Sequence, residues 1–119
     1  MTDQKVLFIT GAAGGIGMET CRAFARQGYA VAYNDYREEN GRKVGAMLRE
    51  IGVESEFLCG DVTDERRVGE MVKKCVERFG RIDVLINGAG GLGGRSKIDE
   101  MSTEFYHRVM DLNMTSVFY

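Results

Sequence analysis

Proline and tryptophan are absent from this 119-residue sequence, histidine occurs once, and there are three cysteines. Cys21, Cys59 and Cys75 are odd in number, far apart and outside any Cys-x-x-Cys spacing, so the sequence supports neither a disulfide framework nor a zinc site. We therefore expect reduced cysteines that fill the core, and no bound metal. His107 has no partner at a metal-ligand or catalytic-triad spacing, so we expect it on the exposed side of a helix.

A large excess of charge and a long apolar run are also missing. Lysine and arginine number 16 and aspartate and glutamate 18, so nothing indicates the positive field that a nucleic-acid backbone or an anionic membrane attracts. The longest apolar run is too short to cross a bilayer, and residues 1–5 are polar and unlike a signal peptide. These features favour a cytoplasmic protein that binds neither nucleic acid nor a membrane.

Apolar patterns of two kinds alternate along the chain. Short apolar runs predict strands at 6–10, 29–34, 56–60 and 82–87. Between them, apolar residues at helical spacing predict helices that end at Gly28, Gly52 and Gly80. Strands separated by helices of this length must pair in parallel through crossovers. The sequence therefore predicts an α/β fold, a doubly wound, Rossmann-like parallel sheet forming one domain over residues 1–119.

The third and fourth helices carry more specific expectations. The stripe of the third helix expected to face the sheet consists of Val68, Met71, Val72, Cys75, Val76 and Phe79. Thr63 or Asp64 is expected to cap this helix, and Ser102 to cap the fourth. The fourth helix has no stop signal before Tyr119, so we expect the sequence to be truncated inside an element.

Glycine is abundant, with 16 residues, and two clusters stand out. The first, Thr10-Gly11-Ala12-Ala13-Gly14-Gly15-Ile16-Gly17, lies between the first strand and the first helix. Glycine there permits a sharp turn and a close approach of backbone N–H groups to an anion, and the helix N-terminus adds partial positive charge. The cluster predicts a cradle for a pyrophosphate. The alternative is a glycine turn needed only to pack the strand against the helix.

The spacing Thr-Gly-x-x-x-Gly-x-Gly resembles that of the short-chain dehydrogenase/reductase family, and the resemblance covers the whole chain. It differs from Gly-x-Gly-x-x-Gly, because Thr20 stands where a third glycine would follow Gly15 and Gly17. The resemblance implies a Rossmann fold and an NAD(P)-dependent oxidoreductase, similar to the family's 3-ketoacyl reductases. It also implies that Gly11, Gly15, Ile16 and Gly17 face the cofactor diphosphate.

Asp35 lies at the end of the second predicted strand, where a dinucleotide-binding fold needs an acceptor for the adenosine ribose hydroxyls. Its carboxylate would repel a 2′-phosphate, so it favours NAD over NADP. Arg37 could instead pair with a 2′-phosphate and resembles the arrangement in NADP-using ketoacyl reductases, which keeps NADP as the alternative. The alternatives without cofactor binding are that Asp35 is a solvent-exposed turn residue and that Arg37 is an ordinary surface residue.

Gly60-Asp61-Val62 follows the third predicted strand. In the family, an Asp-Val pair at this point lies along the adenine ring, with the carboxylate accepting the exocyclic amine. The resemblance implies these contacts for Asp61 and Val62. The alternative for Asp61 is a helix-entry residue that assists Thr63 and Asp64.

Asn87-Gly88-Ala89-Gly90 ends the fourth predicted strand and resembles the family's Asn-Asn-Ala-Gly signature, with Gly88 replacing the second asparagine. By this resemblance Asn87 helps hold the sheet, and the small residues let the backbone pass close to the cofactor ribose. Gly88 forfeits the hydrogen bonds of an amide. The glycine-rich loop that follows, 91–95, is either a substrate entrance or a plain connection.

Asn113 resembles the fourth-helix asparagine of the family's catalytic tetrad, which helps hold a water that links the active-site lysine to solvent. The alternative is a polar residue on a packed helix. The family's proton donor is a Tyr-x-x-x-Lys pair assisted by a serine. None of the five tyrosines here has a lysine four residues later in the sequence.

We therefore expect the cofactor-binding, N-terminal part of an oxidoreductase that transfers hydride between nicotinamide and an alcohol or carbonyl substrate, as a homo-oligomer in the complete protein. A non-catalytic dinucleotide-binding or interaction module is the alternative.

Overall fold

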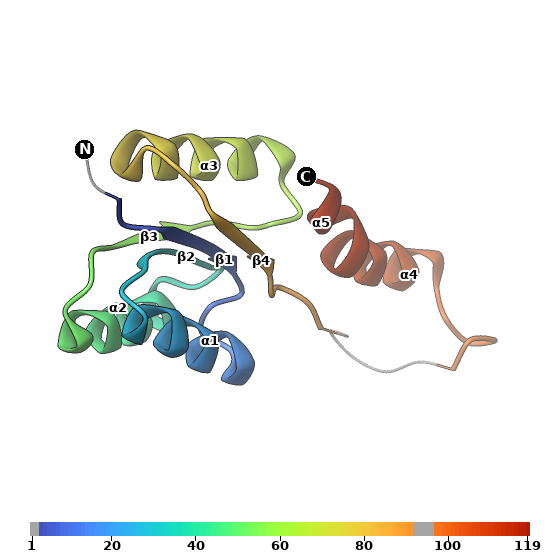
Figure 1. The fold of residues 1–119 in the computed structure, drawn as a ribbon. Coiled ribbons are helices and arrows are strands. Elements are labelled where there is room, and N and C mark those ends of the chain that lie inside the picture. Colours follow the sequence, from blue (N-terminus) through green and yellow to red (C-terminus); the bar gives the residue numbers. More distant parts are fainter. Residues whose placement is uncertain (1–2, 92–96) are drawn as a thin grey trace.

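Four parallel strands form one sheet in the order β3-β2-β1-β4 in the computed structural model, which describes residues 3–91 and 97–119 (Figure 1). The strands are β1 (Val6–Thr10), β2 (Ala30–Asp35), β3 (Ser55–Cys59) and β4 (Val84–Asn87). Leu7 pairs with Val31 on one side and with Val84 on the other, so β1 is an interior strand, and all five of its residues are buried. The predicted α/β fold with a parallel sheet is confirmed.

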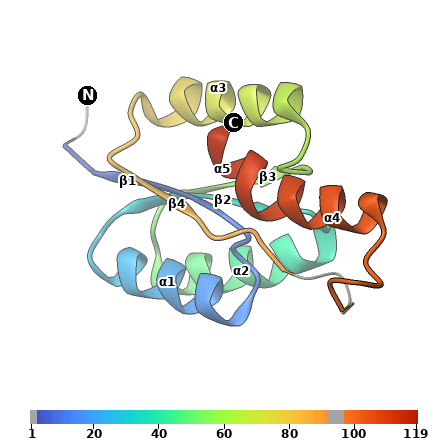
Figure 2. The ribbon, with the colours of Figure 1, turned by 90° about the vertical axis from the view of Figure 1, so that its right-hand side faces the viewer.

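Helices cover both faces of the sheet (Figures 1 and 2). Helices α1 (Gly15–Arg26) and α2 (Glu38–Ile51) lie on one face, and α3 (Glu65–Phe79) lies on the other. Successive side chains of a strand point to opposite faces. Accordingly Leu7 and Ile9 of β1 pack with α1 and α2, while Val6 and Phe8 pack with α3.

The helix ends follow the glycine and capping pattern of the sequence. Gly28, Gly52 and Gly80 follow α1, α2 and α3 with φ of 87°, 95° and 79°, a conformation that glycine adopts without steric cost. The carboxylate of Asp64 accepts from the backbone N–H of Arg67 at the start of α3. These predicted stops and the Asp64 cap are confirmed, and the predicted strand limits differ from the observed ones by up to two residues.

The predicted inward stripe of α3 is too wide. Met71 and Cys75 are buried against the sheet, whereas Val72 and Val76 are 38% and 44% exposed. Each of these valines follows a buried residue and therefore lies about 100° further round the helix. The α3 contact with the sheet is a narrow row at i and i+4, which does not reach them.

The predicted fourth helix is divided. Helix α4 (Thr103–Met110), capped by the Ser102 hydroxyl, is followed by a π-helical turn, η1 (Asp111–Thr115), and by the short α5 (Ser116–Phe118). The Asn113 amide donates to the carbonyl of Val109, 2.8 Å away, within the widened turn. Such turns are rare and occur often at functional sites. The predicted entrance loop 91–95 lies outside the described residues except for Gly91.

Within the described part of the chain, no helix has both the length and the apolar character needed to cross a membrane.

Candidate functional site

A cavity of about 460 Å³ opens beside the loops that follow the strands. After β1 the chain runs through α1 to β2 on one side, and later through α3 to β4 on the other side of β1. The loops therefore diverge at the carboxyl ends of the strands, which is where open α/β sheets bind ligands. Seven of the predicted site residues line this cavity: Gly11, Asp35, Asp61, Val62, Gly88, Ala89 and Gly90.

Different constraints act on the glycines of the first loop. Gly11 has a φ of 64°, and a Cβ there would lie 2.7 Å from the carbonyl oxygen of Gly88. A Cβ on Gly17 would collide with the carbonyl oxygen of Gly11. A Cβ on Gly15 would meet no atom of residues 3–91 or 97–119 within 4 Å. Packing therefore requires glycine at 11 and 17, but leaves open space in front of Gly15.

The amino end of α1 carries no acidic side chain in its first turn and no side-chain cap. In contrast, α3 and α4 are capped by Asp64 and Ser102, and α2 has Glu38 and Glu39 in its first turn. The partial positive charge of the first N–H groups of α1 is thus not offset by a side chain of its own turn.

Asp35 connects three segments. One carboxylate oxygen accepts from the backbone N–H of Ala13, 3.3 Å away in the glycine loop. The other accepts from the N–H of Arg37 at 3.0 Å and from the side-chain amide of Asn40 at 3.3 Å. The carboxylate therefore lies next to the start of α1. Arg37 contributes its backbone to this cluster, and its side chain does not line the cavity.

Thr10 joins the two glycine clusters. Its hydroxyl oxygen accepts from the backbone N–H groups of Gly88 and Ala89, at 3.1 and 3.2 Å. A Cβ on Gly88 would lie 2.5 Å from the carbonyl oxygen of Thr10. A side chain at 88 would require the two loops to move apart, so the close approach of Thr10 accompanies the glycine that departs from the Asn-Asn-Ala-Gly pattern.

Asp61 has a local structural role as well as a place in the cavity. One of its carboxylate oxygens accepts from the backbone N–H and the hydroxyl of Thr63, at 2.9 and 2.7 Å. The helix-entry alternative is therefore observed, and it engages one oxygen. Val62, beside it, is buried.

Asn113 ties the fourth helical segment to the end of β4. Its side chain donates to the carbonyl of Gly91 at 2.7 Å and accepts from the N–H of the same residue at 3.0 Å. A Cβ on Gly90 would lie 2.7 Å from the Asn113 oxygen. The side chain thus holds the loop after β4 and the π-helical turn together.

The predicted set and the cavity overlap in part. The predicted residues outside the lining are Gly15, Ile16, Gly17, Arg37, Asn87 and Asn113, and the lining residues not predicted are Ala13, Gly14, Asn34, Tyr36, Asn40, Gly60 and Leu112. Asn34 could have been predicted as a site residue, since it is the one amide side chain in the otherwise apolar first five residues of β2. The sequence gives no such signal for Leu112, because only the folded chain brings η1 to this cavity.

None of the three cysteines lines the cavity. Cys21 and Cys75 are buried and Cys59 is partly exposed, and all three are free thiols. Burial raises the pKa of Cys21 to about 12 and that of Cys75 to about 11. Among residues 3–91 and 97–119, no group of three or more His, Cys, Asp or Glu side chains is placed to hold a metal ion.

Comparison with known families gives a match to short chain dehydrogenases over residues 5–119. The chain belongs to the short-chain dehydrogenase family. Among curated members, an uncharacterized oxidoreductase of Thermotoga maritima is 40% identical over 114 residues. A putative ketoacyl reductase of the monensin polyketide synthase of Streptomyces virginiae is 40% identical over 115. These matches cover 96% and 97% of this chain but 44% of each relative, so the chain spans less than half the length of these short-chain dehydrogenases.

Solved structures show the same relation. An NADH-dependent reductase complexed with NAD is 42% identical, with a TM-score of 0.89 over 97% of this chain and 48% of that one. A variant of actinorhodin polyketide ketoreductase with NADPH is 37% identical, with a TM-score of 0.92 over 98% of this chain and 44% of that one. The sheet and its helices are thus those of a short-chain dehydrogenase.

Proposed function

We propose that this chain binds the adenosine diphosphate part of a nicotinamide dinucleotide in the cavity, and so serves hydride transfer between nicotinamide and an alcohol or carbonyl substrate. The observation that carries the proposal is the position of the Asp35 carboxylate, hydrogen-bonded to the glycine loop through Ala13 at the rim of a cavity shared by both glycine clusters. An acceptor for ribose hydroxyls and a cradle for a diphosphate are thereby adjacent.

The residues around the first helix fit a diphosphate. Gly15 faces open space, so it is the approach of a ligand, and no packing contact of the protein, that would require glycine there. The N–H groups at the start of α1, directly after the cavity-lining Gly14, carry partial positive charge without a competing acid in that turn.

A preference for NAD over NADP follows from charge. A carboxylate held beside the ribose would repel a 2′-phosphate. Asp35 is held by Ala13 and Asn40 in addition to its neighbour Arg37, so it cannot turn away without breaking these bonds. The exposed Arg37 side chain lies outside the cavity lining, which weakens the case for a 2′-phosphate partner.

A bound nicotinamide cofactor supplies the hydride acceptor or donor. The residues of this chain would bind and orient it: Asp61, through the oxygen not bonded to Thr63, and Val62 at the adenine, and the backbone of Gly88, Ala89 and Gly90 at the ribose. Binding of a nicotinamide cofactor is supported by two similar solved structures, the NADH-dependent reductase complexed with NAD and the actinorhodin ketoreductase variant with NADPH.

The test compares the affinities of the protein for NADH and NADPH. Replacing Asp35 by alanine is expected to raise the Kd for NADH about tenfold, because an ionic acceptor is lost, while NADPH binds equally well or better. Glu39→Ala, which removes an exposed acid from the first turn of α2, is the control for net charge and is expected to leave both values unchanged. An unchanged ratio of the two Kd values in Asp35→Ala would refute the proposed role.

Binding without turnover is the second candidate, favoured by the lack of a Tyr-x-x-x-Lys pair in these 119 residues. The two candidates differ in an assay of the whole natural protein that contains these residues, because this chain spans less than half the length of the relatives it matches. NADH oxidation by that protein with a panel of ketones and aldehydes, above the rate without protein, supports the oxidoreductase. Saturable NADH binding by that protein with no oxidation supports the binding module.

A further inference from the structure

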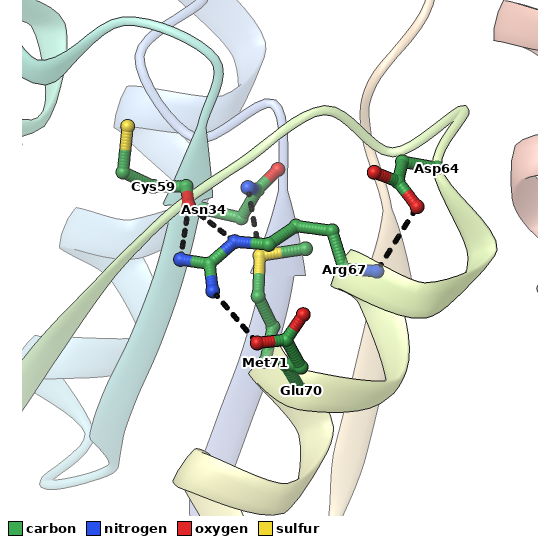
Figure 3. Close-up of polar contacts among 6 residues, drawn as sticks. All are labelled: Asn34, Cys59, Asp64, Arg67, Glu70 and Met71. Atoms are coloured by element: carbon green, nitrogen blue, oxygen red, sulfur yellow. Dashed lines mark hydrogen bonds and ion pairs between the residues drawn. The ribbon is translucent and has the colours of Figure 1, made fainter.

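Three successive carbonyl groups at the end of β3 are held by side chains from two other elements; Figure 3 shows the one at Cys59, bonded to Arg67. Asn34 of β2 binds the carbonyls of Leu58 and Gly60, and Arg67 of α3 binds the carbonyl of Cys59. Gly60 is also the first residue of the β3–α3 turn, residues 60–63. Gly60, Asp61 and Val62 of this turn line the cavity.

Asn34 acts from inside the sheet. It is 1% exposed, and its amide nitrogen lies 2.8 Å from the oxygen of Leu58, 3.1 Å from that of Gly60 and 3.3 Å from the sulfur of Met71. A buried amide is stable only when it is hydrogen-bonded, so these bonds restrain both partners.

Arg67 acts from the outer side. The N–H of Gly60 donates to the carbonyl of Asp35 on β2, and carbonyls of a strand alternate in direction, so that of Cys59 points away from β2. Because β3 is an edge strand of the sheet, no other strand among the described residues satisfies that carbonyl. The guanidinium of Arg67 does so with two donors, Nε at 2.9 Å and Nη2 at 2.5 Å.

The same residue is bonded at both ends of the turn. The backbone N–H of Arg67 donates to the Asp64 carboxylate at 3.2 Å, where α3 starts, while its side chain returns to Cys59, where β3 ends. Its stem covers Gly60, since a Cβ there would lie 2.7 Å from Cγ of Arg67. The β3–α3 turn is thus closed into a loop whose ends Arg67 joins.

We propose that Arg67 is a positioning residue for the adenosine end of the cofactor site: its bond to Cys59 sets the β3–α3 turn in the position from which Asp61 and Val62 contact the adenine. This inference rests on the proposed cofactor binding and adds a residue that touches no part of the ligand. Asn34 supports the same turn from the opposite side.

The chain offers a matched control. Arg78, near the other end of α3, also ties the helix to the β3 region, through the carboxylates of Glu54 at 2.8 Å and Glu56 at 3.0 Å. It lies among residues that border a separate hollow, remote from the glycine loops. If Arg67 only fastens α3 to the sheet, the loss of either arginine should have the same effect on ligand affinity.

The experiment measures the Kd for ADP-ribose and the Tm of the unmodified protein and of Arg67→Ala, Arg67→Lys and Arg78→Ala. We expect the Kd of Arg67→Ala to rise about tenfold, the scale of one lost charge-assisted hydrogen bond. Arg67→Lys keeps one charged donor group, so its Kd is expected to lie between those of Arg67→Ala and the unmodified protein. The Kd of Arg78→Ala is expected to stay within about twofold of that of the unmodified protein, even if its Tm falls as much as the Tm of Arg67→Ala.

Two outcomes overturn the inference while the proposed function stands: a Kd for Arg67→Ala within about twofold of the unmodified protein, or an equal weakening in Arg78→Ala. If Arg67→Ala does not fold by circular dichroism, Arg67→Lys decides, and an unchanged Kd there has the same meaning. Absence of ADP-ribose binding by the folded, unmodified protein overturns the proposed function and this inference with it.

Discussion

At the scale of single residues, the glycines of the first loop separate packing from ligand approach. A Cβ at 17 collides with the carbonyl of Gly11, whereas a Cβ at 15 meets nothing within 4 Å. Both positions belong to the same repeating pattern in the sequence, which does not distinguish them. The folded backbone does, because only it places one Cα against a carbonyl and the other against open space.

We predict that alanine at 17 lowers stability, whereas alanine at 15 weakens NADH binding. Gly17→Ala should lower the unfolding free energy by about 1–3 kcal/mol, because the loop has to shift to admit a methyl group. Gly15→Ala should leave it unchanged to within about 1 kcal/mol, yet weaken NADH binding about tenfold, because the methyl group occupies the space for the diphosphate. Urea denaturation and NADH fluorescence titration measure the two quantities. Unweakened binding by Gly15→Ala would contradict the diphosphate position.

Asp35 and Asn40 show how far residue-level inference extends. Asp35 was predictable, because it is an acid at a fixed distance after the glycine loop and at the end of a strand. Asn40 was not, since an asparagine early in an exposed helical segment has many uses. Its bond to the Asp35 carboxylate depends on how α2 starts relative to β2, and that angle is absent from the sequence pattern.

At the scale of elements, α1 and α3 place a buried thiol on opposite faces of the sheet. Cys21 packs in the cluster under α1 and α2, and Cys75 in the cluster under α3. Burial raises the pKa of both thiols, to about 12 and about 11, from 9.0. In the folded protein, Cys21 of α1 and Cys75 of α3 therefore stay protonated where they pack against the sheet.

We predict that stability falls in alkaline solution. The unfolded chain loses these protons from about pH 9, while the folded chain retains them, so the unfolded state binds fewer protons and the free energy of unfolding decreases as pH rises. Each thiol contributes a slope of about 1.4 kcal/mol per pH unit above that point. Urea denaturation between about pH 8 and 10.5 measures the slope. Cys21→Ala should reduce it, and Cys59→Ala, at a partly exposed position, is the control; an equal slope in the protein and in Cys21→Ala would contradict the assignment.

The sequence was sufficient to predict which segments form helices, but not how much of the surface of α3 contacts the sheet. Apolar spacing and glycine stops gave α1, α2 and α3, because both signals are local. Val72 and Val76 fit the helical period as well as Met71 does, but only the distance between α3 and the sheet decides that the contact is one row wide. Asn113, in the π-helical turn that divides the last helix, is likewise bonded to Gly91, 22 residues earlier, and no local pattern shows that bond.

At the scale of the whole molecule, the candidate site exists only where the loops after several strands meet. The position of β1 between β2 and β4 brings Gly11, Asp35 and Ala89 to one cavity. That assembly could be expected from the alternation of strands and helices, since parallel strands end at the same edge. The contribution of Leu112 could not be expected, because no local pattern shows that η1 reaches the cavity.

The measurement that tests the account most directly is a titration of the ¹⁵N-labelled protein with NAD, followed by backbone amide chemical shifts. We predict saturable shifts for the amides of Gly14, Gly15, Asp61 and Ala89, and none for Arg78 at the far end of α3. A folded protein whose amides do not shift at millimolar NAD, or whose shifts gather around Arg78, would contradict cofactor binding at the carboxyl ends of the strands.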